Sequence, residues 1–162
     1  MTVALLNRRY LLAAGSSMVA TGVSGLVVPA LAQGLAATRS MPGGANNYRK
    51  DAPIVERIGR GGFWMSGTVR RAGDGAPLAG QRIQIWAHTT EGYEDNAKSH
   101  GATLTDANGA FRLEMPQIVP VFGQPHGHLA YDSGEFKTVF LRPVMGSAKD
   151  TGLEAHFVLQ PV

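Results

Sequence analysis

The sequence predicts an all-β protein whose main domain, residues 63–162, folds as an antiparallel β-sandwich. The chain of 162 residues contains 21 glycines and 7% aromatic residues, a composition that favours a turn-rich β protein over a helical bundle. Short runs of alternating polar and apolar residues recur from residue 63 onward, separated by clusters of Gly, Asn and Asp. No clear helical period accompanies them, so we expect packed sheets of short strands.

The alternation also locates the strands and their faces. In residues 82–87, Ile83, Ile85 and Ala87 share one face, and Trp86 lies on the other face with the polar residues. Because a strand tryptophan usually packs in a sandwich core, we expect that position for Trp86, with a substrate-lining role as the alternative. The strands are expected at residues 63–70, 82–87, 102–105, 110–114, the run that follows His126, 136–141 and 154–159.

Residues 1–32 have the pattern of an export signal. Arg8 and Arg9 precede a mildly apolar run rich in Gly, Ala and Ser, and Ala30-Leu-Ala32 forms a small-x-small cleavage site. The arginine pair followed by Tyr10 resembles the twin-arginine signal of bacteria. Glycines interrupt the apolar run, so we expect no stable membrane anchor. These features predict a bacterial protein that reaches the periplasm or the exterior by the twin-arginine route.

Residues 33–62 lack periodicity and are predicted to form an extended or disordered arm. Positions 41–47 are turn and linker residues, and a short charged run follows them. We expect this arm to carry no chemistry.

Charge and residue types narrow the possible functions. The formal net charge is +3, two of the positive charges lie in the leader, and no basic run with interleaved aromatic residues occurs. Nucleic-acid binding is therefore not expected. The chain contains no cysteine, so disulfides and thiolate–metal sites are excluded. Any metal must be held by His, Tyr or carboxylate side chains.

His126 and His128 are the first candidates for such ligands. Residues two apart on a strand project from the same face, which would place two imidazoles a few ångströms apart, as one metal ion requires. A pair of surface histidines after a Pro- and Gly-rich loop is the alternative interpretation, because the motif is short and common.

Several sequence blocks of the predicted sandwich occur together in a known family. They are Ser66-Gly-Thr-Val69, Pro77-Leu-Ala-Gly-Gln-Arg-Ile-Gln-Ile-Trp86, Gly92-Tyr93, Thr105-Asp-Ala-Asn-Gly-Ala-Phe111 and Pro125-His-Gly-His128. In order and approximate spacing, they resemble the intradiol ring-cleavage dioxygenases over most of residues 63–159. The earlier blocks are also similar to transthyretin-like and carboxypeptidase-regulatory sandwich modules, which have no metal. The Ile-Trp and Gly-Tyr pairs and the His-x-His motif favour the dioxygenases.

The resemblance implies a specific metal centre and reaction. Members of the family hold one non-haem Fe(III) with two tyrosines and two histidines, and they insert both atoms of O₂ between the hydroxylated carbons of a catechol. By this resemblance the ligands are Tyr93, His126 and His128. Val119 stands where the second tyrosine is expected, and Gly123 stands where the family has an arginine. Neither can take the proton of a diol or stabilise its charge.

Three kinds of function therefore follow from the sequence. The first is an exported Fe(III) dioxygenase that acts on a catechol-like aromatic diol with O₂. The second is a relative that binds iron or copper without cleaving rings, and the third is a metal-free binding module. His88 is most simply a surface residue, with a role as substitute ligand or supporting base as the alternative. Glu94 and Asp95 are expected to be solvated, although a carboxylate could replace the missing phenolate. His100 and His156 are expected to be structural. Many catalytic members of the family use a long N-terminal helical region for dimerisation. The sequence shows no such region, so we expect a monomer or a differently built oligomer.

Overall fold

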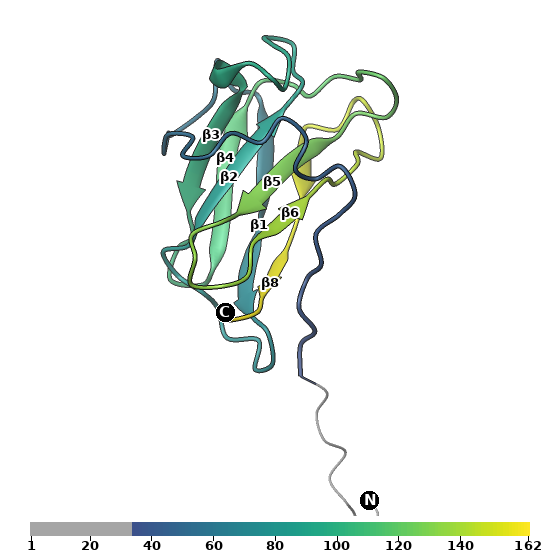
Figure 1. Ribbon diagram of the computed structural model, residues 1–162. Coiled ribbons are helices and arrows are strands. Elements are labelled where there is room, and N and C mark those ends of the chain that lie inside the picture. Colours follow the sequence, from purple (N-terminus) through teal and green to yellow (C-terminus); the bar gives the residue numbers. More distant parts are fainter. Residues whose placement is uncertain (1–33) are drawn as a thin grey trace, which may run out of the picture. The chain divides into compact units, whose positions relative to one another are not determined.

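The computed structural model describes residues 34–162, so the predicted signal at 1–32 lies outside the described residues. Within the described part, the strands form two four-stranded sheets that face each other (Figure 1). One sheet has the order β4-β1-β7, with β8 also pairing with β1, and the other has the order β3-β2-β5-β6. The strands are β1 (Phe63–Arg71), β2 (Arg82–Ala87), β3 (His100–Leu104), β4 (Ala110–Met115), β5 (Gly127–Tyr131), β6 (Val139–Leu141), β7 (Gly152–Glu154) and β8 (Phe157–Leu159).

This architecture confirms the predicted all-β sandwich, with differences at its C-terminal end. The strand expected at 154–159 is divided into β7 and β8, which both pair with β1 in parallel. The division occurs where Ala155 donates its N–H to Ser66 O. Its own carbonyl approaches Gly67 so closely that a Cβ there would lie 1.6 Å from the oxygen. Gly67 therefore leaves room for the interruption between the two short strands.

The core lies between the inner faces of the two sheets. The predicted alternation in β2 is confirmed, because Ile83, Ile85 and Ala87 are fully buried in this core. The strand expected at 136–141 is shorter, since β6 covers only its last three residues. Phe136 still packs in the core and forms an isolated bridge with Pro161. Tyr131 is also fully buried there.

The arm, defined here as residues 34–62, lies along the sandwich. Backbone hydrogen bonds tie it to both sheets, from Thr38 to Val158 of β8, from Met41 to Phe140 of β6 and from Val55 to Ala102 of β3. Figure 1 shows the arm running up beside the sandwich and then across the sheet that contains β2 and β5. Residues 34–62, for which the sequence predicted an extended or disordered arm, thus lie on the domain.

The arm buries Trp86 on a different face of the sheet from the one expected. This side chain is fully buried, yet it does not belong to the core between the sheets. It lies on the outer face of β2, opposite His100 of β3 and His128 of β5 in the strand registers. The expected burial of Trp86 is confirmed, but it occurs outside the cluster between the sheets, because the arm, whose Asn46 O accepts from the indole N–H at 2.9 Å, covers this outer face.

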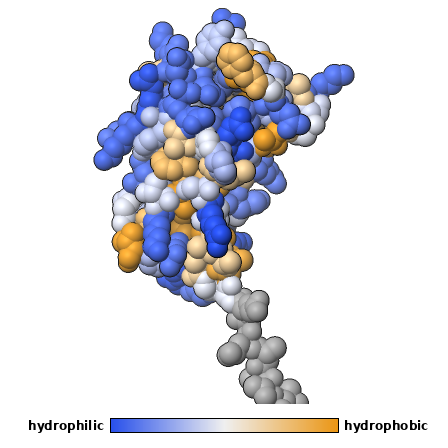
Figure 2. Space-filling model, turned by 45° about the vertical axis from the view of Figure 1, so that its right-hand side comes forward, coloured by the Kyte–Doolittle hydropathy of each residue, from blue (hydrophilic) through white to orange (hydrophobic). Residues whose placement is uncertain are grey.

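The outer surface is mainly hydrophilic. Figure 2 shows that polar side chains dominate the upper part of one face, with apolar side chains in smaller areas. Within residues 34–162, no helix is long and apolar enough to span a membrane.

Candidate metal centre

The two histidines of the His-x-His motif come together as predicted. His128 lies in β5, and His126 immediately precedes that strand and bridges to Val144. Their ring centroids are 5.0 Å apart, and both side chains are buried on the outer face of the sheet. The intervening Gly127 faces the core, where a Cβ would lie 2.8 Å from Met65 Cε. Strand alternation therefore places both imidazoles on one face.

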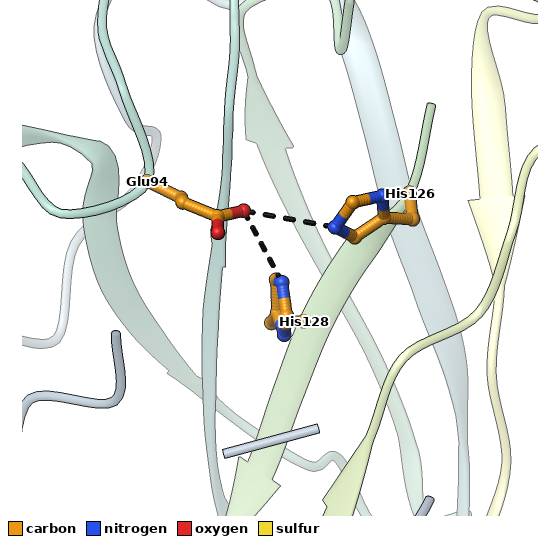
Figure 3. Close-up of side chains that lie close together, drawn as sticks. All are labelled: Glu94, His126 and His128. Carbon is orange, nitrogen blue, oxygen red and sulfur yellow. Dashed lines mark ion pairs between the residues drawn. The ribbon is translucent and has the colours of Figure 1, made fainter. Parts of the chain in front are cut away.

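A carboxylate completes the group. Glu94 belongs to the loop between β2 and β3, and its Oε2 lies 3.2 Å from His128 Nε2 and 3.7 Å from His126 Nε2 (Figure 3). The loop is held near this position because His100 Nε2 lies 2.7 Å from the carbonyl oxygen of Glu94. His100 also stacks on Trp86, whose opposite neighbour in the register is His128.

The hydrogen bonding of His128 shows which of its ring nitrogens carries the proton and which presents a lone pair to Glu94. Nδ1 lies 3.1 Å from Gly44 O, which can only accept, so Nδ1 carries the proton. In the neutral ring Nε2 is then an acceptor, and it faces the carboxylate oxygen, another acceptor. Both His128 Nε2 and Glu94 Oε2 are buried without a hydrogen-bond partner.

A cation between these acceptors would remove the conflict. A proton is disfavoured, because burial lowers the pKa of His128, and the nearby Glu94 only partly opposes that effect. A metal ion suits the geometry better. Metal–donor distances of about 2.0–2.2 Å place neighbouring donors roughly 3.0–3.6 Å apart, close to the separations found here. Glu94, His126 and His128 each offer one donor atom within 4.8 Å of the others.

His126 is oriented by two neighbours on its far side. Its Nδ1 lies 2.9 Å from Gln124 O and 3.3 Å from an Arg142 guanidinium nitrogen. The carbonyl oxygen accepts a hydrogen bond from Nδ1–H when Nε2 binds a metal. Arg142 places a positive charge behind this histidine.

The other predicted site residues lie on the same loop or beside it. Tyr93 is 65% exposed, and its ring packs on His88 at 4.6 Å between centroids. His88 Nδ1 is buried without a hydrogen-bond partner. Val119 is half-buried and donates its N–H to His88 O at 3.2 Å. Gly123 is exposed with a φ of 131°, a backbone conformation that an arginine would rarely adopt. Ligation by Tyr93 and a supporting role for His88 stay predictions.

Sequence reasoning did not anticipate the contribution of the arm. Gly44 and Asn47, which lie in the segment expected to carry no chemistry, contact His128 and Glu94 respectively. No local pattern in residues 41–47 could have revealed these contacts. For Glu94, the available signal was a carboxylate next to Tyr93 in a chain that lacks the second tyrosine.

Comparison with known proteins agrees with this fold. No protein-family model and no curated protein sequence matches the chain. Among solved structures, hydroxyquinol 1,2-dioxygenase from Pseudomonas putida DLL-E4 superposes with a TM-score of 0.57 at 14% identity, over 79% of this chain and 68% of that one. For 3-chlorocatechol 1,2-dioxygenase from Rhodococcus opacus 1CP the TM-score is 0.58 at 16% identity, over 80% and 74%. The chain has the fold of the intradiol ring-cleavage dioxygenases.

A third solved structure is covered almost completely by the alignment with this chain. The dioxygenase domain of a dioxygenase carbohydrate-binding protein fusion from Streptomyces sp. SirexAA-E superposes with a TM-score of 0.56 at 17% identity. The alignment covers 76% of this chain and 96% of that domain. The intradiol dioxygenase-like sandwich is therefore represented here almost completely.

Proposed function

We propose that the chain is an exported non-haem iron protein of the intradiol dioxygenase type, which acts on a catechol-like aromatic diol with O₂. The observation that carries this proposal is the buried group of Glu94, His126 and His128, whose facing acceptor atoms lack hydrogen-bond partners. The fold supports the reaction class, since the similar solved structures are named as catechol-type 1,2-dioxygenases.

In this proposal the protein residues hold and orient the metal. His126 and His128 present Nε2. The carbonyl group of Gly44 keeps the proton of His128 on Nδ1, and Gln124 O accepts from Nδ1 of His126 when that nitrogen carries the proton. Glu94 supplies the negative charge through Oε2. When bound, an iron ion supplies Lewis-acid and redox chemistry toward the diol and O₂. His88, whose Nδ1 has no partner, is our candidate for taking a proton from the diol.

The identity of the anionic ligand determines which oxidation state the site favours. Two neutral imidazoles and one carboxylate form the ligand set of many non-haem Fe(II) sites. A Tyr93 phenolate would instead favour Fe(III) and give a visible charge-transfer band. Copper bound through the two imidazoles is a further alternative. The geometry favours Glu94, because its carboxylate points at both histidines, while Tyr93 is largely exposed.

Two substitutions in the same loop test this proposal. Glu94→Gln keeps the size of the side chain and removes its charge, so we expect iron retention to fall at least tenfold. Tyr93→Phe, the matched control, should retain the metal and its spectrum. If Tyr93→Phe instead removes a visible band while Glu94→Gln binds normally, Tyr93 is the ligand. A purified chain that binds neither iron nor copper would leave only a metal-free module.

A second candidate function is metal binding without ring cleavage. It is favoured by Val119 and Gly123, which cannot take over the roles of the family tyrosine and arginine. Product formation from catechol, protocatechuate or hydroxyquinol by the iron-loaded protein would decide for the dioxygenase. Absence of turnover with all three, together with tight iron binding, would favour this second candidate.

Export by the twin-arginine route is part of the proposal and has its own test. Changing Arg8 and Arg9 to lysine should keep the precursor in the cytoplasm, because that pair is what the route recognises. Normal export and cleavage of the double variant would assign the signal to another route.

A further inference from the structure

One short segment of the arm contacts both a histidine and the glutamate of the candidate metal centre. Gly44 O accepts from Nδ1 of His128 on β5, and Asn47 Nδ2 donates to Oε1 of Glu94 at 2.8 Å. The two contacts are three residues apart in the arm, whereas their partners belong to a strand and to a separate loop. The arm segment 44–47 thus bridges the histidine strand and the glutamate loop.

The backbone of this segment is fixed by its own turns and by the sandwich. Asn46 N–H donates to Gly43 O at 3.1 Å, and Asn46 O accepts from Trp86 at 2.9 Å. Gly44 is buried so closely against β6 that a Cβ would lie 2.8 Å from Phe140 O. The segment therefore has little freedom to shift along the sheet.

Asn47 has the properties of a residue placed for its side chain. Its φ is 56°, in the left-handed region that asparagine tolerates better than most residues. The amide donates to one carboxylate oxygen of Glu94, Oε1, and leaves the other, Oε2, directed at His126 and His128. A glutamate on a loop otherwise has several accessible rotamers.

We propose that Asn47 is a positioning residue for the metal centre, which fixes the Glu94 carboxylate so that Oε2 faces the two histidines. This inference rests on the proposed metal-binding function. Groups that orient metal ligands typically contribute a factor of about 10–100 to metal affinity. The arm, rather than the sandwich alone, then sets the distance between the glutamate and the histidines.

The test compares two glycine substitutions at neighbouring positions. Asn47→Gly removes the amide without straining the positive φ. Asn46→Gly is the control for added flexibility in this segment, because no side-chain hydrogen bond of Asn46 is present in the described part of the chain. Co(II) is the probe, and its binding is followed by quenching of Trp86, which lies 5.1 Å from the His128 ring. A Trp64→Phe background leaves Trp86 as the sole tryptophan.

We expect Asn47→Gly to weaken Co(II) binding by about tenfold or more relative to Asn46→Gly, while metal-free Asn47→Gly unfolds at a denaturant concentration no lower than that of metal-free Asn46→Gly, because glycine suits the positive φ of position 47. Equal Co(II) affinities of the two variants would overturn the inference. The inference would also be overturned if metal-free Asn47→Gly lost free energy of unfolding in proportion to its loss of Co(II) affinity. Failure of the metal centre itself is distinguished by Glu94→Gln, which would then bind Co(II) as well as the unsubstituted chain.

Discussion

The two sheets of this sandwich have very different outer faces, and each contains one tryptophan. On β1, Trp64 is 37% exposed, with the Arg112 guanidinium carbon 3.7 Å from its ring centroid. On β2, Trp86 is fully buried between His100 and His128, with ring planes tilted by only 8° and 11°. Both strands alternate regularly, so strand geometry alone does not explain the difference.

The arm explains it, because it crosses only the second face. There it supplies backbone carbonyls as acceptors, so the indole N–H of Trp86 and Nδ1 of His128 are buried with partners. On the first face, the outward side chains remain in contact with solvent. Covering a sheet with a segment rich in turns, whose carbonyls are available as acceptors, converts an ordinary outer face into a buried polar site.

The largest expected effect concerns the tryptophans themselves. Trp86→Ala should lower the free energy of unfolding by about 3–5 kcal/mol, because it leaves a cavity under the arm. Trp64→Ala should cost about 1 kcal/mol or less, since it loses mainly an exposed cation–π contact. Denaturant unfolding of both variants measures the difference. Similar losses at the two positions would show that the two faces are not energetically distinct.

A smaller effect is expected from crowding the arm against β6. Gly44→Ala introduces a Cβ against the backbone of Phe140, and overpacking of this kind costs about 1–3 kcal/mol. Gly146→Ala is the control, because its Cβ would meet only Asp150 Oδ2 at 3.6 Å. Protease sensitivity within residues 34–62 should rise in the first variant alone. Resistance equal to that of Gly146→Ala would mean that this close contact does not hold the arm.

The pH dependence of stability should also distinguish the faces. Burial lowers the pKa of His100 below its ordinary value of 6.5. The unfolded chain therefore takes up a proton near pH 6.5 that the folded chain does not, and stability falls as the pH drops through that value. His100→Gln should make this fall shallower, with His128 contributing the part that remains. The matched His156→Gln alters an exposed histidine on the first sheet's side; an equal flattening by both variants would contradict the assignment.

The smallest expected effect is a difference in the solvent exposure of the two tryptophans, and no change in stability accompanies it. In single-tryptophan variants, Trp86 emission should resist quenching by iodide, whereas Trp64 emission should be quenched readily. Trp86 should become accessible in Gly44→Ala if the arm is displaced. Equal quenching of the two tryptophans in otherwise unaltered protein would show that the arm does not cover β2 in solution.

The sequence by itself determined the sandwich, most strand positions and the pairing of His126 with His128. Each depends on a local pattern: strand alternation with a period of two, turn residues between the runs, and the i, i+2 spacing of the histidines. The division between β7 and β8 escaped this reasoning, because it depends on Gly67, a residue of a distant strand.

Only the tertiary structure decided the rest of the site. Glu94 is 47 residues from Asn47, and Gly44 is 84 residues from His128. The burial of Trp86 likewise depends on Asn46, 40 residues earlier. Such contacts depend on where the arm lies on the sandwich, and that position depends on how the turns of the arm fit the outer face of the sheet. Periodicity describes which side of a strand a residue occupies, and it contains no information about the segment that later covers that side.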